Sequence, residues 1–74
     1  MGQGRSNETD GLSEREREVM KLIAQGLRTR EIATRLSVSY KTVEKHRSNL
    51  MRKLGLRSAT AVAAYAIANG YVRI

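Results

Sequence analysis

Apolar side chains recur at helical spacing along this chain, most clearly from about residue 40 to residue 54. At roughly 100° per residue, Val43, Leu50 and Leu54 lie within roughly 20° of one line, which predicts a buried stripe. The opposite side of the same helix carries Lys41, Lys45, Ser48 and Arg52. The pattern therefore predicts an amphipathic helix that packs on a core through one face and presents cations on the other.

A shorter helix is predicted at about residues 30–36, directly before the long one. Its apolar residues are Ile32, Ala33 and Leu36. Thr29 is its predicted N-cap, Ser39 is the N-cap of the long helix, and Gly55 fits the left-handed position that ends a helix. Two helices joined by a turn of about three residues form the helix-turn-helix pattern.

A further helix is predicted at about residues 14–25, and it begins with a capping box formed by Ser13 and Glu16. Its buried face, with Met20 at the edge, is predicted to consist of Val19, Leu22 and Ile23. Gly26 ends it. Surface ion pairs are expected among Arg15, Glu16, Arg17 and Glu18, with pairing to the later basic helices as the alternative.

The last predicted helix, at about residues 59–69, follows the N-cap Ser58 and carries no charged residue. Val62 and Ala66 are expected to face the core. Three residues are then left on the far side, namely Ala63, Ala64 and Ile67. This outer face is either a contact with a second copy of the chain or a neutral surface coated with alanine. With this helix the sequence predicts an all-α fold of four helices.

The first eleven residues differ from the rest of the chain. They contain three glycines and polar residues without apolar periodicity, which predicts a flexible tail or linker at residues 1–11 and a folded domain at residues 12–74. With 74 residues in total, the chain is long enough for one small domain, and a core of this size leaves no room for a deep active-site cavity.

The charge is uneven along the chain, whose formal net charge is +7. Residues 1–27 carry a net charge of −1, whereas residues 28–74 hold ten Lys/Arg and two Asp/Glu, which gives +8. A basic half predicts a polyanionic partner, either nucleic acid or an anionic membrane surface. The membrane is disfavoured because the apolar stripe behind the basic face is needed for the core, and no apolar run approaches about 18 residues.

Residues for catalysis or metal binding are scarce. His46 is the single histidine, there is no cysteine, and no glycine-rich phosphate loop occurs. We therefore expect no enzymatic activity, no metal, no cofactor and no small-molecule substrate.

From Leu12 to Val72 the chain resembles the C-terminal DNA-binding domain of the LuxR/NarL/FixJ regulators of bacteria. The matching residues are Leu12-Ser13-Glu14-Arg15-Glu16, Glu18-Val19, Gly26, Glu31-Ile32-Ala33, Leu36, Val38-Ser39, Thr42-Val43, His46, Lys53-Leu54 and Ser58. The run from Thr42 to Arg47 is most similar to the FixJ branch. The resemblance implies a transcriptional regulator that binds two DNA half-sites as a dimer, with the helix at 40–54 in the major groove.

The resemblance also implies a role for individual residues. Base edges are expected to be contacted by Glu44, Lys45 and Ser48, and phosphates by Lys41, Thr42 and Arg47. The helix at 30–36 begins close to Arg28, Thr29 and Arg30, where free N–H groups and cations favour a phosphate. Arg52, on the basic face of the helix at 40–54, is a further expected phosphate contact. The dimer contact is expected at Ala63, Ala64 and Ile67.

Glu44 departs from the wider family pattern, because many members carry Lys or Arg at this position. A carboxylate there either accepts a hydrogen bond from cytosine N4 or rejects other bases. Two rival functions remain. One is a protein-interaction module, for example for RNA polymerase, that uses the helix at 59–69. The other is RNA binding, which the three tyrosines and the lack of Trp and Phe disfavour. The expected location is the bacterial cytoplasm, at the nucleoid.

Overall fold

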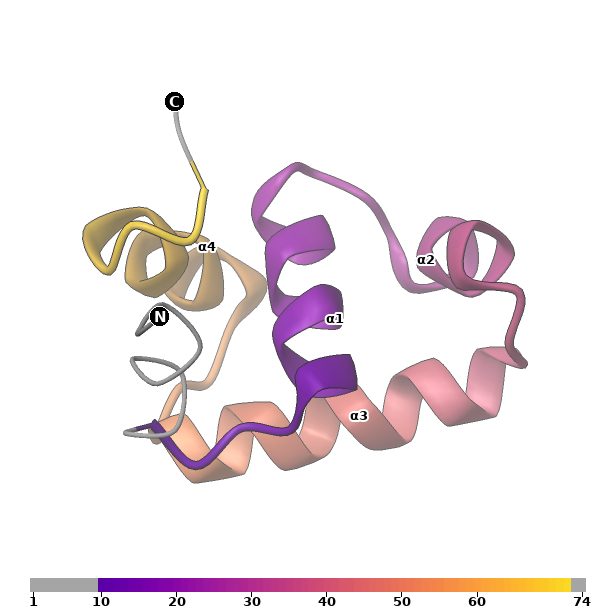
Figure 1. The fold of residues 1–74 in the computed structure, drawn as a ribbon, viewed down its shortest axis with the longest axis horizontal. Helices are drawn as coiled ribbons and strands as arrows, with labels where there is room; N and C mark the ends of the chain where they lie inside the picture. Colours follow the sequence, from indigo (N-terminus) through magenta and orange to yellow (C-terminus); the bar gives the residue numbers. More distant parts are fainter. Residues whose placement is uncertain (1–9, 73–74) are drawn as a thin grey trace, which may run out of the picture.

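The computed structural model describes residues 10–72, which form four helices and no strand. The helices are α1 (Glu14–Ala24), α2 (Thr29–Leu36), α3 (Tyr40–Leu54) and α4 (Ala59–Ala68) (Figure 1). The predicted all-α fold is confirmed, and each predicted helix end agrees with the structure within one residue. Most of the predicted tail, residues 1–9, lies outside the described residues.

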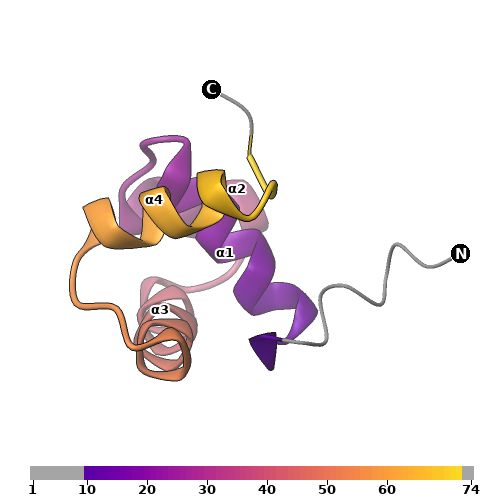
Figure 2. The ribbon, with the colours of Figure 1, turned by 90° about the vertical axis from the view of Figure 1, so that its left-hand side faces the viewer.

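Helix α1 lies at the centre of the domain. It packs against α2, α3 and α4, and α2 also packs against α3. Figure 1 shows α1 between α4 and α2, above α3, and Figure 2 shows α3 nearly end-on below α1 and α4. The largest fully buried side chains are Met20, Ile32, Leu50, Val19, Val43 and Val62. All four helices thus contribute to one small core.

The predicted buried face of α1 was too narrow. Met20, placed at its edge, is completely buried, whereas Leu22 is only partly buried. Because α1 is covered by the other three helices, its buried surface is wider than the single apolar stripe of a helix that packs on one side.

Local capping fixes where the helices begin. The predicted capping box of α1 is present, since the hydroxyl of Ser13 accepts from the Glu16 N–H and the Glu16 carboxylate accepts from the Ser13 N–H. Ser39 and Ser58 cap α3 and α4, as predicted. The predicted N-cap of α2, Thr29, was wrong.

The N-cap of α2 is Arg28, and Thr29 is the first helical residue. The carboxylate of Glu31 accepts from the Arg28 N–H at 2.7 Å and so satisfies one of the free N–H groups at this end of the helix. The hydroxyl of Thr29 is therefore free to bind a side chain of α3.

The two ends of the described chain meet beside α4. The Asp10 carboxylate accepts from the Leu12 N–H at 3.0 Å and from the Tyr71 hydroxyl at 2.5 Å. The rings of Tyr65 and Tyr71 are stacked with centroids 6.3 Å apart. Burial and the hydrogen bond to Asp10 raise the pKa of Tyr71 to about 12, so this hydroxyl stays a donor.

The turn between α2 and α3 depends on Ser37. This residue has φ 58° and ψ 43°, a left-handed conformation that glycine adopts more easily. Backbone bonds from Ser37 N–H to Thr34 and from Val38 N–H to Ala33 hold the turn. The backbone of Ser37 is therefore strained, and this conformation sets the angle between the two helices.

Replacing Ser37 by glycine should relieve this strain. We expect Ser37→Gly to stabilise the domain by about 0.5–1 kcal/mol, after the larger entropy of the unfolded glycine chain is subtracted. Thermal unfolding should then shift upward by several degrees, on the order of 3–8 °C. Ser39→Gly is the matched control, because it makes the same change at an extended N-cap and should cost a few tenths of a kcal/mol. If the Ser37→Gly domain melted at no higher a temperature than the parent, the claim that the backbone of Ser37 is strained would be wrong.

Candidate nucleic-acid interface

The outer face of α3 is as predicted. Val43 and Leu50 are completely buried and Leu54 is half-buried. The exposed residues on the opposite side are Lys41, Glu44, Lys45, Ser48 and Arg52. In Figure 1, α3 runs along the lower edge of the molecule, and its lower side faces away from the other three helices. The three residues predicted to contact bases, Glu44, Lys45 and Ser48, therefore share one accessible surface.

One flank of α3 is joined to α2. The guanidinium of Arg47 donates to the Thr29 hydroxyl at 3.2 Å, and both side chains are partly buried. Nearby, the guanidinium carbon of Arg30 lies 5.4 Å from the centre of the Tyr40 ring. Side chains of both helices line an open hollow of about 450 Å³ between α2 and α3. Its residues are Ile23, Gly26, Leu27, Arg28, Thr29, Arg30, Tyr40, Arg47 and Ala59. We refer to it as the α2–α3 hollow.

This hollow brings together three residues predicted to contact phosphate, Arg28, Thr29 and Arg47. Tyr40 was not among the residues predicted to be functional. The available signal was an aromatic residue placed directly after the N-cap Ser39, outside the apolar stripe. Its contact with Arg30 depends on the angle between α2 and α3, which the sequence pattern does not give.

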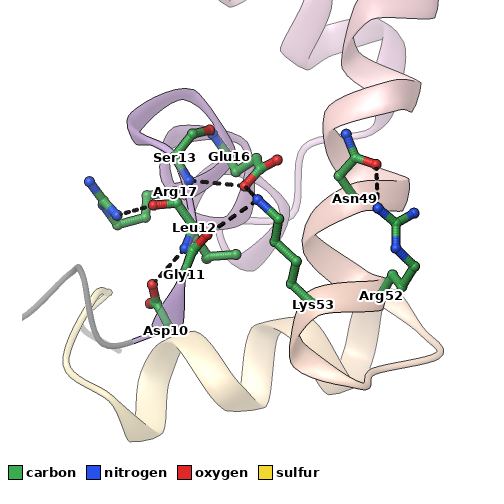
Figure 3. A network of polar contacts seen from close by, with 9 residues as sticks. All are labelled: Asp10, Gly11, Leu12, Ser13, Glu16, Arg17, Asn49, Arg52 and Lys53. Atoms are coloured by element: carbon green, nitrogen blue, oxygen red, sulfur yellow. Dashed lines mark hydrogen bonds and ion pairs between the residues drawn. The ribbon is translucent and has the colours of Figure 1, made fainter.

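The other flank of α3 is joined to α1 by an ion pair. The Lys53 ammonium lies 2.8 Å from Glu16 Oε1 and donates to the Gly11 carbonyl at 3.2 Å. Figure 3 shows the Glu16 carboxylate between Lys53 and the Ser13 N–H, so that one carboxylate caps α1 and binds α3. Glu16 is only 5% exposed. Lys53 thus holds the C-terminal part of α3 against the start of α1.

The charged residues of α1 therefore divide between two roles. Arg15 and Glu18 form the expected exposed ion pair at 3.0 Å. For Glu16 the alternative holds, pairing with a later basic helix, because this residue lies on the same side of α1 as the buried Met20 and Ile23. Arg17 donates to the Leu12 carbonyl at 2.6 Å.

The pKa of Glu16 reflects these contacts. Burial alone would raise it, but hydrogen bonds from Lys53 and Ser13, together with the positive charge of Lys53, outweigh burial and lower the pKa below its ordinary value. Glu16 is therefore ionised at neutral pH, as its ion pair with Lys53 requires.

Two remaining candidates for phosphate contact are engaged within the domain. Arg52 lies at the C-terminal end of the basic face, and its guanidinium donates to the side-chain oxygen of Asn49 at 3.2 Å (Figure 3). The Thr42 hydroxyl lies 2.9 Å from that of Ser39 and takes part in the N-cap of α3.

The predicted dimer residues lie on α4, apart from the basic face. Ala64 and Ile67 are exposed, and Ala63 is half-buried. Figure 1 shows α4 and α2 on opposite sides of α1. The structure thus places the candidate dimer contact and the α2–α3 hollow on different parts of the domain.

The described residues include neither a cluster of metal ligands nor a membrane-spanning helix. Within residues 10–72, no group of three His, Cys, Asp or Glu side chains is arranged to hold a metal ion. His46 is half-buried on α3. None of the described helices is long and apolar enough to cross a membrane.

A helix-turn-helix with an exposed basic second helix defines the class of protein, a helix-turn-helix DNA-binding domain. Comparison with protein families gives the same answer, because residues 10–66 match the model of the bacterial regulatory proteins of the luxR family. The chain belongs to this family. It is the DNA-binding domain of a transcriptional regulator and not an enzyme. The predicted resemblance is confirmed at this level, whereas the finer placement near the FixJ branch stays a prediction.

Known relatives agree with the family match. Over 68 residues the chain is 47% identical to the oxygen regulatory protein NreC of Staphylococcus aureus, in strains JH9, JH1 and Mu3 alike. The similarity covers 88% of this chain and 31% of each relative. The chain therefore spans about a third of the length of the curated relatives it matches.

The ion pair of Glu16 predicts a specific dependence of stability on pH. Since its pKa is lowered by folding, its contribution is fully present above the ordinary value of 4.5 and is lost as the pH falls through the pKa of the folded domain. The melting temperature should therefore drop as the pH falls below about 4.5, and less so in Glu16→Gln.

Glu18→Gln is the matched control for this measurement. It removes a carboxylate from the same helix, but the Glu18 side chain is 53% exposed and its ion pair contributes little. Its pH profile should follow that of the parent. If Glu16→Gln showed the same acid-side loss as the parent and the control, the Glu16–Lys53 pair would not be the source of this dependence.

Proposed function

We propose that this domain binds specific sites in duplex DNA, with α3 lying in the major groove. The observation that carries this proposal is the exposed outer face of α3, which presents Lys41, Lys45 and Arg52 along a helix of 15 residues. Such a helix is roughly 22 Å long, and its side chains can enter a groove about 12 Å wide. Contacts with α1 and α2 hold α3 from behind, which supports this role.

Base recognition is assigned to the centre of this face. Lys45 can donate to guanine O6 and N7, and Glu44 can accept from cytosine N4. Glu44 lines a shallow depression together with Arg47, Ser48 and Met51. Glu44 is exposed on the same side of α3 as Lys45 and Ser48, which supports it as a base contact.

Phosphate contacts are assigned to the two ends of the face. Lys41, Thr42 and Arg52 flank the base-reading residues, and Arg28, Thr29 and Arg47 gather at the α2–α3 hollow. Phosphate contacts of this kind set the register of a protein on DNA, while base contacts provide the specificity.

We further propose that two copies bind adjacent half-sites through α4. The exposed residues of α4 include Ile67, which is 38% exposed, and the helix carries no charge. A pair of half-sites about one helical turn apart would match such a dimer. RNA polymerase is the second candidate for this surface, since an apolar face of this kind also suits a protein partner. In either case the domain would act at the nucleoid in the bacterial cytoplasm.

Lys45→Ala tests the base-reading role. The variant should lose preference at one base pair per half-site, which corresponds to roughly 1–3 kcal/mol of discrimination. The fold should survive, because Lys45 is exposed and alanine favours helices. A selection from random duplexes would measure the preference. Lys21→Ala removes the same charge from the exposed end of α1 and should leave the preference unchanged. If Lys45→Ala only weakened binding uniformly, Lys45 would be a phosphate contact.

Ile67→Glu tests the dimer contact. A charge at this position should weaken binding to a double site by about tenfold or more, given the burial energy of an isoleucine, and should leave binding to one half-site intact. Gln25→Glu is the control, because it adds the same charge at an exposed position outside α4. Unchanged double-site affinity and unchanged sedimentation of Ile67→Glu would leave α4 free for another partner, such as the polymerase.

A further inference from the structure

Arg30 and Tyr40 form a contact between α2 and α3 that none of the assigned roles explains. Tyr40 is the first residue of α3 and is 44% exposed, although large apolar side chains are otherwise mostly buried in this domain. The Arg30 guanidinium lies over its ring, with the carbon 5.4 Å from the ring centre. A contact of this geometry is an attractive cation–π interaction, and it limits where the guanidinium can go.

The surroundings of this pair are strongly positive. Three arginines line the α2–α3 hollow, Arg28, Arg30 and Arg47, and its lining includes no carboxylate. Among residues 10–72, Arg30 forms no ion pair with an acidic side chain. Three cations that line one hollow repel one another, and a bound anion reduces this repulsion. The Glu31 carboxylate, which is not part of the lining, binds the Arg28 N–H and offsets only part of this charge.

Stacking on Tyr40 does not compete with anion binding. A guanidinium stacks through its flat face, and its N–H groups point outward in the plane, where they can donate to phosphate oxygens. Arg47 is similarly restrained, by its hydrogen bond to Thr29. Two guanidinium groups thus line one hollow, each held by a neighbouring side chain.

We infer that Tyr40 is a positioning residue for DNA binding, whose ring holds the Arg30 guanidinium at the α2–α3 hollow so that it binds a phosphate of the DNA backbone. This inference rests on the proposed function, since the hollow borders the basic face of α3. The ring acts through Arg30 and requires no hydrogen bond from the Tyr40 hydroxyl.

A double-mutant cycle tests the inference. DNA affinity is measured on a selected duplex for the parent, Tyr40→Leu, Arg30→Gln and the double variant, with melting curves to confirm that each is folded. Tyr40→Leu should weaken binding by about two- to fivefold, the range of an exposed cation–π contact. Arg30→Gln should weaken it more and lower the slope of log affinity against log salt by about 0.9. The double variant should bind like Arg30→Gln alone, because Tyr40 acts only through Arg30.

Two control variants distinguish the positioning of Arg30 by Tyr40 from a structural role of Tyr40 in the fold. Tyr40→Phe keeps the ring and should restore the affinity and the salt slope of the parent. Arg35→Gln removes an arginine from the other end of the same helix, where it lines a different depression, and its effect should simply add to that of Tyr40→Leu. If Tyr40 had only a structural role, Tyr40→Leu would lower the melting temperature. It would then weaken DNA binding by the same factor whether it is combined with Arg30→Gln or with Arg35→Gln.

Three results would overturn the inference while leaving the proposed function intact. They are parent-like binding by Tyr40→Leu, additive losses for Tyr40→Leu and Arg30→Gln, or a loss in Tyr40→Phe equal to that in Tyr40→Leu. Failure of the parent domain to bind any duplex would overturn the proposed function itself.

Discussion

The ion pair between Glu16 and Lys53 is the contact on which the position of α3 depends. Glu16 is almost fully buried, and a buried carboxylate without a partner is costly, so Lys53 and the Ser13 N–H must stay beside it. Nearer the N-terminal end of α3, Arg47 donates a hydrogen bond to Thr29 of α2. These contacts lie on opposite flanks of α3, roughly 9 Å apart along its axis. They hold the helix against α1 and α2 and leave its outer face free.

This arrangement divides the domain into parts with separate tasks. Helix α1 supplies the centre of the core and carries Glu16, while α2 and α3 carry the candidate DNA contacts. Helix α4 packs on α1 and presents an uncharged outer face. Because the candidate DNA contacts and the uncharged outer face of α4 lie on different helices, variants of one surface can be designed without changing the other. The ion pair orients α3 and also contributes to stability, because loss of Lys53 would leave the buried Glu16 carboxylate without its positive partner.

Much of this fold was predictable because its signals are local. Helix ends follow from Ser13, Ser39 and Ser58, which cap the turn that directly follows them, and the two faces of α3 follow from its periodicity. Most contacts that were missed, or predicted only as an alternative, join different helices, and the local cap of α2 by Glu31 is the exception. Glu16 and Lys53 are 37 residues apart in sequence, and the contact of Arg30 with Tyr40 depends on how α2 and α3 cross. Periodicity shows which side of a helix is buried, but not which neighbour covers it.

The most direct test of this account is a titration of the ¹⁵N-labelled domain with a duplex that holds one half-site, followed by NMR. We expect the shifted amide signals to belong to the first turn of α2 and to α3 around Lys45, with α4 unchanged. We also expect the shifts to become smaller as salt is added, because phosphate contacts are screened and counterions compete for them. Shifts centred on α4 or on the exposed side of α1, with α3 unaffected, would contradict the account.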